Sequence, residues 1–172
     1  MPHIFEEAPT GRAKCRGCNL PIQKGELRFG ERFPNPFGEG EATLWFHPLC
    51  AAYKRPEPIL ESLTPEIPDR DALNQAAQAS QAHRRLPRID GAELSPSGKA
   101  NCRQCRQPIE RGSWRIRLVF YEEGRFSPGG FLHLACRGEY FEGNDILATL
   151  LHFSQKLDEE QKKQLEAAFS AA

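Results

Sequence analysis

Eight residues recur in this sequence with a spacing that suits a metal ion. Each of two copies reads Cys-x2-Cys, then 28 or 27 residues, then His-x2-Cys. The residues are Cys15, Cys18, His47 and Cys50 in the first copy and Cys102, Cys105, His133 and Cys136 in the second. Zinc prefers four tetrahedral Cys and His ligands, and one tight turn can present both thiolates of a Cys-x2-Cys pair. The spacing therefore predicts two structural Cys3His sites and two Zn²⁺ per chain.

Other uses of these cysteines explain less of the pattern. A redox Cys-x-x-Cys pair would require a βαβ context and would leave the His-x2-Cys unexplained. An iron site with four sulfur ligands would lack its fourth cysteine, and a catalytic zinc would need an open coordination position. Disulfides are typical of exported proteins, whereas the N-terminal sequence has no basic segment followed by an apolar one. We expect no metal or catalytic role for His3, His83 and His152.

The two copies are a duplicated module. Gly11–Arg28 and Gly98–Arg115 agree at nine of eighteen positions, and the two Cys pairs are 87 residues apart. Two copies at so long a period are typical of two separate domains, since a solenoid needs more and shorter repeats. The sequence predicts a first domain at 1–85, a linker at 86–97 and a second domain at 98–172.

The segments between the ligands predict a small antiparallel sheet in each copy. Alternating apolar, β-branched and aromatic residues favour strands, and clusters of Gly and Pro favour mobile hairpin loops. The predicted strands are 25–33, 43–47, 112–121 and 131–133. The predicted loops are 34–42 and 122–130.

Helices are predicted after and between the ligand sets. Short helical turns are expected at 51–54 and 137–141, directly after the last ligand of each copy. Longer helices are expected at 69–85, with Asp69 as its N-cap, at 145–153 and at 158–169. The predicted fold class is therefore small α+β modules stabilised by zinc, each a short antiparallel sheet with a flanking helix.

Composition and charge narrow the class of protein. The chain has 172 residues, of which 39% are hydrophobic and 27% charged, with 14 Gly and 14 Pro. These values favour small, loop-rich modules over a layered α/β nucleotide-binding enzyme, and no apolar run is long enough to predict a membrane span. Net charge is zero, but 1–55 carries +2 and 98–143 carries +3, whereas 56–97 and 144–172 carry −3 and −2. The basic modules are a weak indication of phosphate binding.

The sequence around the ligands resembles a known zinc-finger family. Gly-Arg-Ala-Lys-Cys-Arg-Gly-Cys before Gly-Glu-Leu-Arg, a gap of nearly thirty residues, and Trp-Phe-His-Pro-Leu-Cys are similar to the PARP-type zinc finger. That finger occurs as a tandem pair in poly(ADP-ribose) polymerase and singly in a DNA ligase. Its long gap distinguishes it from C2H2 fingers, whose gap is about twelve residues. The resemblance covers both copies and extends to the C-terminal helix predicted at 158–169.

The resemblance implies recognition of DNA strand breaks, which are nicks, gaps and ends. A break exposes a base pair on which an apolar loop can stack while cations bind the phosphates. The family's phosphate-binding cations match positions before the first cysteine and ten residues after the second, and further arginines lie inside the Cys pairs. The phosphate contacts expected here are Arg12, Arg16, Arg28, Lys99, Arg103 and Arg115.

The expected stacking residues are Phe37 and Phe126. At the two positions where the family has apolar stacking residues, this sequence has Gly38 and Ala42 in the first copy and Gly124 and Pro128 in the second. The two phenylalanines are close by, at the Gly/Pro-rich loops, and a shifted loop would let them stack. If they are core residues instead, the alternatives are Leu44, Tyr121 and Leu132.

Together these observations predict a non-enzymatic, zinc-dependent protein that binds broken or nicked duplex DNA and presents it to repair enzymes. The chain ends 36 residues after Cys136, which leaves no room for a polymerase catalytic domain. The alternative is a protein-interaction adaptor that uses the zinc fingers and the acidic helices at 69–85 and 145–169. Salt-dependent binding to nicked DNA distinguishes the two, because phosphate neutralisation releases counterions. No membrane partner is expected; the location is cytoplasmic and on the nucleoid in a bacterium, or nuclear in a eukaryote.

Overall fold

The computed structural model describes residues 2–172. They divide into two compact units, residues 2–87 and 88–172. Each unit is a three-stranded antiparallel sheet with helices, which confirms the predicted fold class of small α+β modules. No helix within residues 2–172 is both long and apolar enough to cross a membrane.

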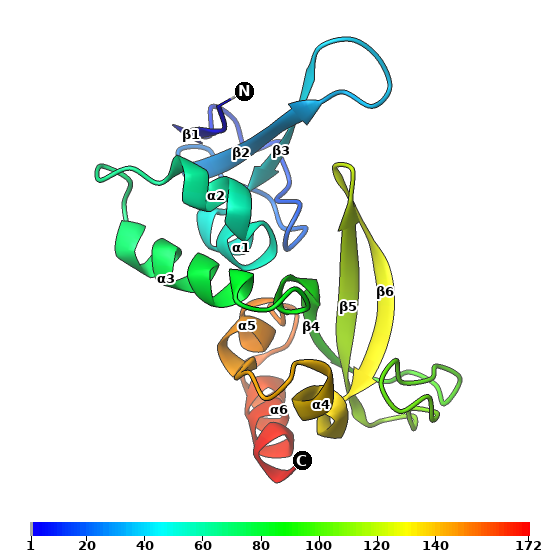
Figure 1. Cartoon of the computed structure of the whole chain (residues 1–172). Helices are drawn as coiled ribbons and strands as arrows, with labels where there is room; N and C mark the ends of the chain where they lie inside the picture. The colour runs from blue at the N-terminus through cyan, green and yellow to red at the C-terminus, as the bar shows by residue number, and fades with distance from the viewer. Residues whose placement is uncertain (1) are drawn as a thin grey trace. The chain divides into compact units, whose positions relative to one another are not determined.

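The sheet of the first unit has the strand order β1-β2-β3 (Figure 1). These strands are β1 (Ile4–Glu7), β2 (Leu27–Pro34) and β3 (Glu41–Phe46). Phe29 and Phe46 are cross-strand partners and both are fully buried, so this pair lies in the core of the unit. The loop at 35–40 joins β2 to β3, as the Gly/Pro-rich segment predicts.

Strand β1 is an element that the sequence analysis misses. Its four residues pair with the start of β2, and the ring of Phe5 lies 5.1 Å from that of Phe29. His3, next to β1, accepts a hydrogen bond from the backbone N–H of Arg32 at 3.0 Å. Four residues are too few for a periodicity argument, and the strand exists because β2 offers a free edge.

Three helices complete the first unit: α1 (Pro48–Lys54), α2 (Pro56–Ser62) and α3 (Arg70–Gln81). The sequence analysis does not predict helix α2, because two prolines so close together favour an interruption of helical structure. Both lie in its first turn, where the missing N–H is not needed. Asp69 precedes α3 as predicted, but its side chain makes no capping hydrogen bond, and the helix ends at Gln81 instead of residue 85.

The sheet of the second unit consists of β4 (Ile89–Leu94), β5 (Trp114–Glu122) and β6 (Arg125–His133), in that order. The segment predicted as a linker at 86–97 therefore differs in the structure, because Ile89–Leu94 is the first strand of this sheet. Glu93 pairs with Arg115, much as Glu6 pairs with Arg28 in the first unit. The strand pairing is long-range, so the polar composition of 86–97 does not reveal it.

The loop predicted at 122–130 is also corrected. Strand β6 begins at Arg125, and only Glu123 and Gly124 separate it from β5. Both residues have positive φ, 47° and 79°, as expected for the tight turn whose twist suits a β-hairpin. Residues 125–130 are therefore paired strand rather than mobile loop.

The helical elements of the second unit agree closely with prediction. A 3₁₀ turn (Leu134–Cys136) leads into α4 (Arg137–Tyr140), and α5 (Leu147–His152) and α6 (Glu159–Ala171) follow. Asp158 and Gln161 exchange side-chain hydrogen bonds with each other's backbone N–H groups, which forms a capping box at the start of α6. The core of this unit contains the buried residues Ile116, Leu132, Phe141, Ile146, Leu150 and Leu165.

Candidate metal centres and nucleic-acid interface

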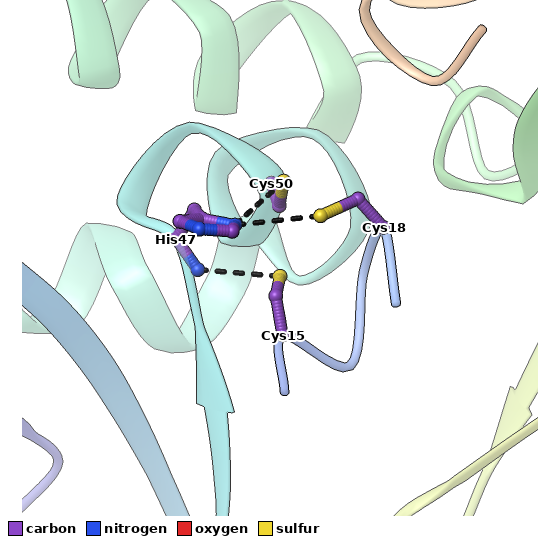
Figure 2. Close-up of side chains that lie close together, drawn as sticks. All are labelled: Cys15, Cys18, His47 and Cys50. Carbon is purple, nitrogen blue, oxygen red and sulfur yellow. Dashed lines mark hydrogen bonds between the residues drawn. The ribbon is translucent and has the colours of Figure 1, made fainter. Parts of the chain in front are cut away.

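The first predicted ligand set comes together in the first unit (Figure 2). One ligand atom from each of Cys15, Cys18, His47 and Cys50 lies within 4.8 Å of every other. The Nδ1 atom of His47 lies 3.4 Å from Cys18 Sγ and 4.0 Å from Cys50 Sγ. Its Nε2 atom faces the carboxylate of Glu26 at 3.7 Å, and this contact orients the ring so that Nδ1 faces the sulfurs.

Local backbone structure brings these ligands together. The Cys pair lies in a turn closed by the bridge between Lys14 and Pro21, whereas His47 and Cys50 lie where β3 passes into α1. Gly17 lets the turn approach α1, because a Cβ at this position would lie 2.8 Å from Cβ of Cys50. The buried Lys54 of α1 donates a hydrogen bond to the carbonyl oxygen of Gly17 at 2.6 Å.

The second unit repeats this arrangement. Cys102, Cys105, His133 and Cys136 also offer ligand atoms within 4.8 Å of one another. His133 Nδ1 lies 3.3 Å from Cys105 Sγ and 3.8 Å from Cys136 Sγ, and its Nε2 lies 3.1 Å from the carbonyl oxygen of Pro108. Cys105 is exposed, whereas no ligand of the first site is, so the second site is the more open of the two.

The electrostatics of both clusters favour a bound cation. Hydrogen bonds from Cys18 and Cys50 lower the pKa of Cys15 to about 3, and the hydrogen bond to Cys15 raises the pKa of Cys50. In the second cluster burial opposes ionisation of Cys102, yet backbone N–H donors lower its pKa to about 7. Burial and the neighbouring sulfur of Cys102 raise the pKa of Cys136 to about 12. Three sulfurs so close together cannot all ionise by themselves, and a divalent metal removes that penalty.

The predicted phosphate contacts Arg28 and Arg115 are buried in the structure, with 8% and 7% of their surfaces exposed. The guanidinium carbon of Arg28 lies 3.5 Å from the ring centre of Trp45, and its Nη2 donates to Glu6 at 2.6 Å. Arg115 lies 3.6 Å above Phe131 and donates to Glu93 at 3.0 Å. Each guanidinium is thus held by a ring and a carboxylate.

Four other predicted cations are exposed. They are Arg12, Arg16, Lys99 and Arg103. All four lie in or just before the Cys-x2-Cys turns, two in each unit. Their positions leave them accessible to a polyanion.

The two predicted stacking residues differ in their environments. Phe37 is 88% exposed at the loop between β2 and β3, where its backbone N–H donates to the side chain of Asn35. Phe126 lies in β6 instead of a loop, is half-buried and contacts the ring of Tyr121 at 5.2 Å. Two of the three alternatives, Leu44 and Leu132, are buried and cannot stack on DNA without unfolding their sheets.

Sequence analysis misses residues that support the sites. Glu6 and Glu93, which hold the buried arginines, are 87 residues apart. That is the offset of the Cys pairs, so extending the repeat toward the N-terminus could have found them. The repeat does not reveal Lys54, because the residue at the same distance after the last ligand of the second copy is Tyr140 instead of a lysine.

The fold and ligand sets define a zinc-finger protein with two Cys3His sites in two small α+β units, which accounts for two Zn²⁺ per chain. Residues 6–82 match the family described as "Poly(ADP-ribose) polymerase and DNA-Ligase Zn-finger region". The chain therefore carries a PARP-type zinc-finger region, and its second Cys3His site indicates a second finger.

Comparison with curated proteins gives relatives of the same kind. The chain is 27% identical to a poly(ADP-ribose) polymerase of Drosophila melanogaster over 157 residues, which cover 79% of this chain and 16% of the relative. It is 29% identical to that of Sarcophaga peregrina over 167 residues, 81% of this chain and 17% of the relative. A third relative, poly(ADP-ribose) polymerase 1 of Oryza sativa subsp. japonica, is 24% identical over 154 residues, 83% of this chain and 16% of the relative. The chain thus spans about one sixth of the length of these relatives.

Proposed function

We propose that this chain is a non-enzymatic DNA-binding module that recognises strand breaks in duplex DNA. The observation that carries the proposal is the exposure of Phe37. Phe37 is 88% exposed. The other exposed large apolar residues among residues 2–172 are Leu20 and Leu94, and only 36% and 41% of their surfaces are exposed. An apolar ring at a loop tip gains little in water, whereas a base pair exposed at a break offers it a surface on which to stack.

The exposed cations supply the phosphate contacts in this proposal. Arg12 and Arg16 flank the first ligand of the first site, and Lys99 and Arg103 do the same in the second unit. Phosphate contacts are independent of sequence, so this arrangement suits recognition of DNA shape rather than of bases. We assign Arg28 and Arg115 a smaller share of the phosphate binding, because each is buried and already paired with a carboxylate.

Replacing Phe37 separates stacking from phosphate binding. We expect Phe37→Ala to weaken binding to a nicked duplex by about 1–3 kcal/mol, the value of one base stacked on one aromatic ring. Binding to the same duplex without the nick should not change, nor should the salt dependence on nicked DNA. Fluorescence anisotropy with labelled duplexes at fixed salt measures all three quantities.

Leu94→Ala is the matched control, since it truncates another exposed apolar side chain that lies on the edge strand β4. It should bind nicked DNA as the unmodified chain does. If Phe37→Ala also binds normally while retaining two zinc ions, stacking by Phe37 is wrong. Phe126→Ala should weaken binding less than Phe37→Ala, because its half-buried ring already contacts Tyr121.

A further inference from the structure

Two arginines of the second unit lie on the same aromatic ring. The guanidinium carbon of Arg88 lies 4.5 Å from the ring centre of Phe120, and that of Arg103 lies 5.1 Å from it. Arg88 also donates from Nη1 to the hydroxyl of the buried Tyr140 at 3.1 Å, which fixes its position. The ring therefore holds two positive charges at one place on β5.

Two consecutive glycines in β6 make this arrangement possible. A Cβ at Gly129 would lie 2.7 Å from two carbons of the Phe120 ring, and a Cβ at Gly130 would lie 3.1 Å from Cδ of Arg103. Glycine weakens a strand, and it often marks a place where another group must approach the backbone closely. Here Gly129 leaves room for the ring of Phe120, and Gly130 leaves room for the aliphatic part of the Arg103 side chain.

The paired charges on Phe120 lack a carboxylate. In the part of the chain that the structure describes, neither Arg88 nor Arg103 has an acidic group within ion-pair distance. Three further arginines that lie on rings are compensated: Arg28 and Arg115 by carboxylates, and Arg137 by two carbonyl oxygens. Two like charges on one ring repel each other, and a bound anion removes that repulsion.

The first unit shows that this site is not a general feature of the repeat. Phe33 and Arg16 occupy the positions that correspond to Phe120 and Arg103, but Thr43 and Leu44 replace the two glycines. Within residues 2–87, the guanidinium of Arg16 makes no cation–π contact with the ring of Phe33. The site therefore needs the glycine pair as well as the cation and the ring.

We propose that Arg88 and Arg103, organised by Phe120, form a phosphate-binding site of the second unit that contacts the backbone of a DNA strand. The inference rests on the proposed function and adds a contact separate from Arg115. Guanidinium groups suit this role because their planar N–H donors bind phosphate oxygens in pairs while the opposite face stacks on a ring. Arg103 is exposed, so the backbone of a DNA strand can reach the site.

The test uses the full zinc-loaded chain and a nicked duplex, with binding measured by anisotropy at several salt concentrations. Arg88→Gln and Arg103→Gln remove the charges but keep an N–H donor, including one for Tyr140. Each should weaken binding about tenfold at 0.1 M salt and reduce the log–log salt slope by about one. The double variant should reduce the slope by about two. Phe120→Leu keeps both charges, so it should weaken binding about two- to fivefold with the slope unchanged.

Arg111→Gln is the control, since it removes an exposed arginine of the same unit that lies outside the proposed site. Its affinity should change less than twofold. If Arg88→Gln and Arg103→Gln match this control while the unmodified chain binds nicked DNA, the Arg88–Arg103 site is overturned and the proposed function stands. If the unmodified chain does not bind nicked DNA, the proposed function fails and this site fails with it. Zinc content and melting temperature identify any variant that has lost its fold.

Discussion

Removing zinc with a strong chelator is expected to unfold both units. Each unit has about 85 residues and a core of few large side chains, so the hydrophobic effect alone gives little stability at this size. The ligand clusters join the Cys-x2-Cys turn to the end of the sheet, and structural zinc sites of this kind contribute about 10–16 kcal/mol of apparent binding free energy. Elemental analysis should give two zinc ions per chain, and circular dichroism should lose its helical signal after chelation.

Single ligand variants assign this effect to each unit. Cys50→Ser and Cys136→Ser should each leave one zinc ion per chain and unfold the unit that carries the substitution. Trp45 and Trp114, the only two tryptophans, lie one in each unit and report them separately by fluorescence. The zinc account is wrong if the unmodified chain binds one zinc ion or if chelation leaves the spectrum unchanged.

Replacing Glu31 is expected to cost the first unit about 3 kcal/mol of unfolding free energy. Glu31 is 4% exposed on β2, and both its carboxylate oxygens accept hydrogen bonds from Nε of Arg55, at 3.0 and 2.9 Å. Arg55 lies between α1 and α2, so this ion pair ties the helices to the sheet. Glu31→Gln takes away the negative charge that balances a largely buried guanidinium, and such a loss costs about 3–5 kcal/mol.

Urea unfolding followed by Trp45 fluorescence, in a Trp114→Phe background with zinc bound, measures this cost. Asp71→Asn is the control, because Asp71 is 94% exposed and its ion pair with Arg70 spans 3.4 Å at the surface. That variant should lose less than about 1 kcal/mol. Equal losses in the two variants would contradict a structural role for the Glu31–Arg55 pair.

The sequence predicts the metal sites well because their chemistry is local and repeated. The short spacing places Cys15 close to Cys18 and His47 close to Cys50. The two pairs must then be brought together by the sheet between them, and the alternating residues of 25–33 and 43–47 predict its strands. The repeat offset then gives the second site. Helix α6 is predicted for the same reason, since Asp158 and the charges that follow it are local signals.

The residues that sequence reasoning misplaces depend on long-range pairing. Strands β1 and β4 are short and contain acidic residues, and they exist because β2 and β5 have edges to pair with. Phe126 is predicted in a loop because Ser127, Pro128 and two glycines follow it, but the tight turn at Glu123–Gly124 brings those residues into register with β5. The burial of Arg28 depends on Glu6, which lies 22 residues earlier, so the sequence shows a cation but not its partner.

The most direct test of the proposed function compares nicked and intact duplexes of one sequence, with the zinc-loaded chain, at several salt concentrations. We expect tighter binding to the nicked duplex, a log–log salt slope corresponding to about four to eight neutralised phosphates, and little change when the sequence is scrambled around the nick. Equal affinity for nicked and intact DNA would contradict break recognition. Binding that does not depend on salt would instead favour a protein-interaction adaptor, and a preference for one base sequence in intact duplex would indicate direct base readout.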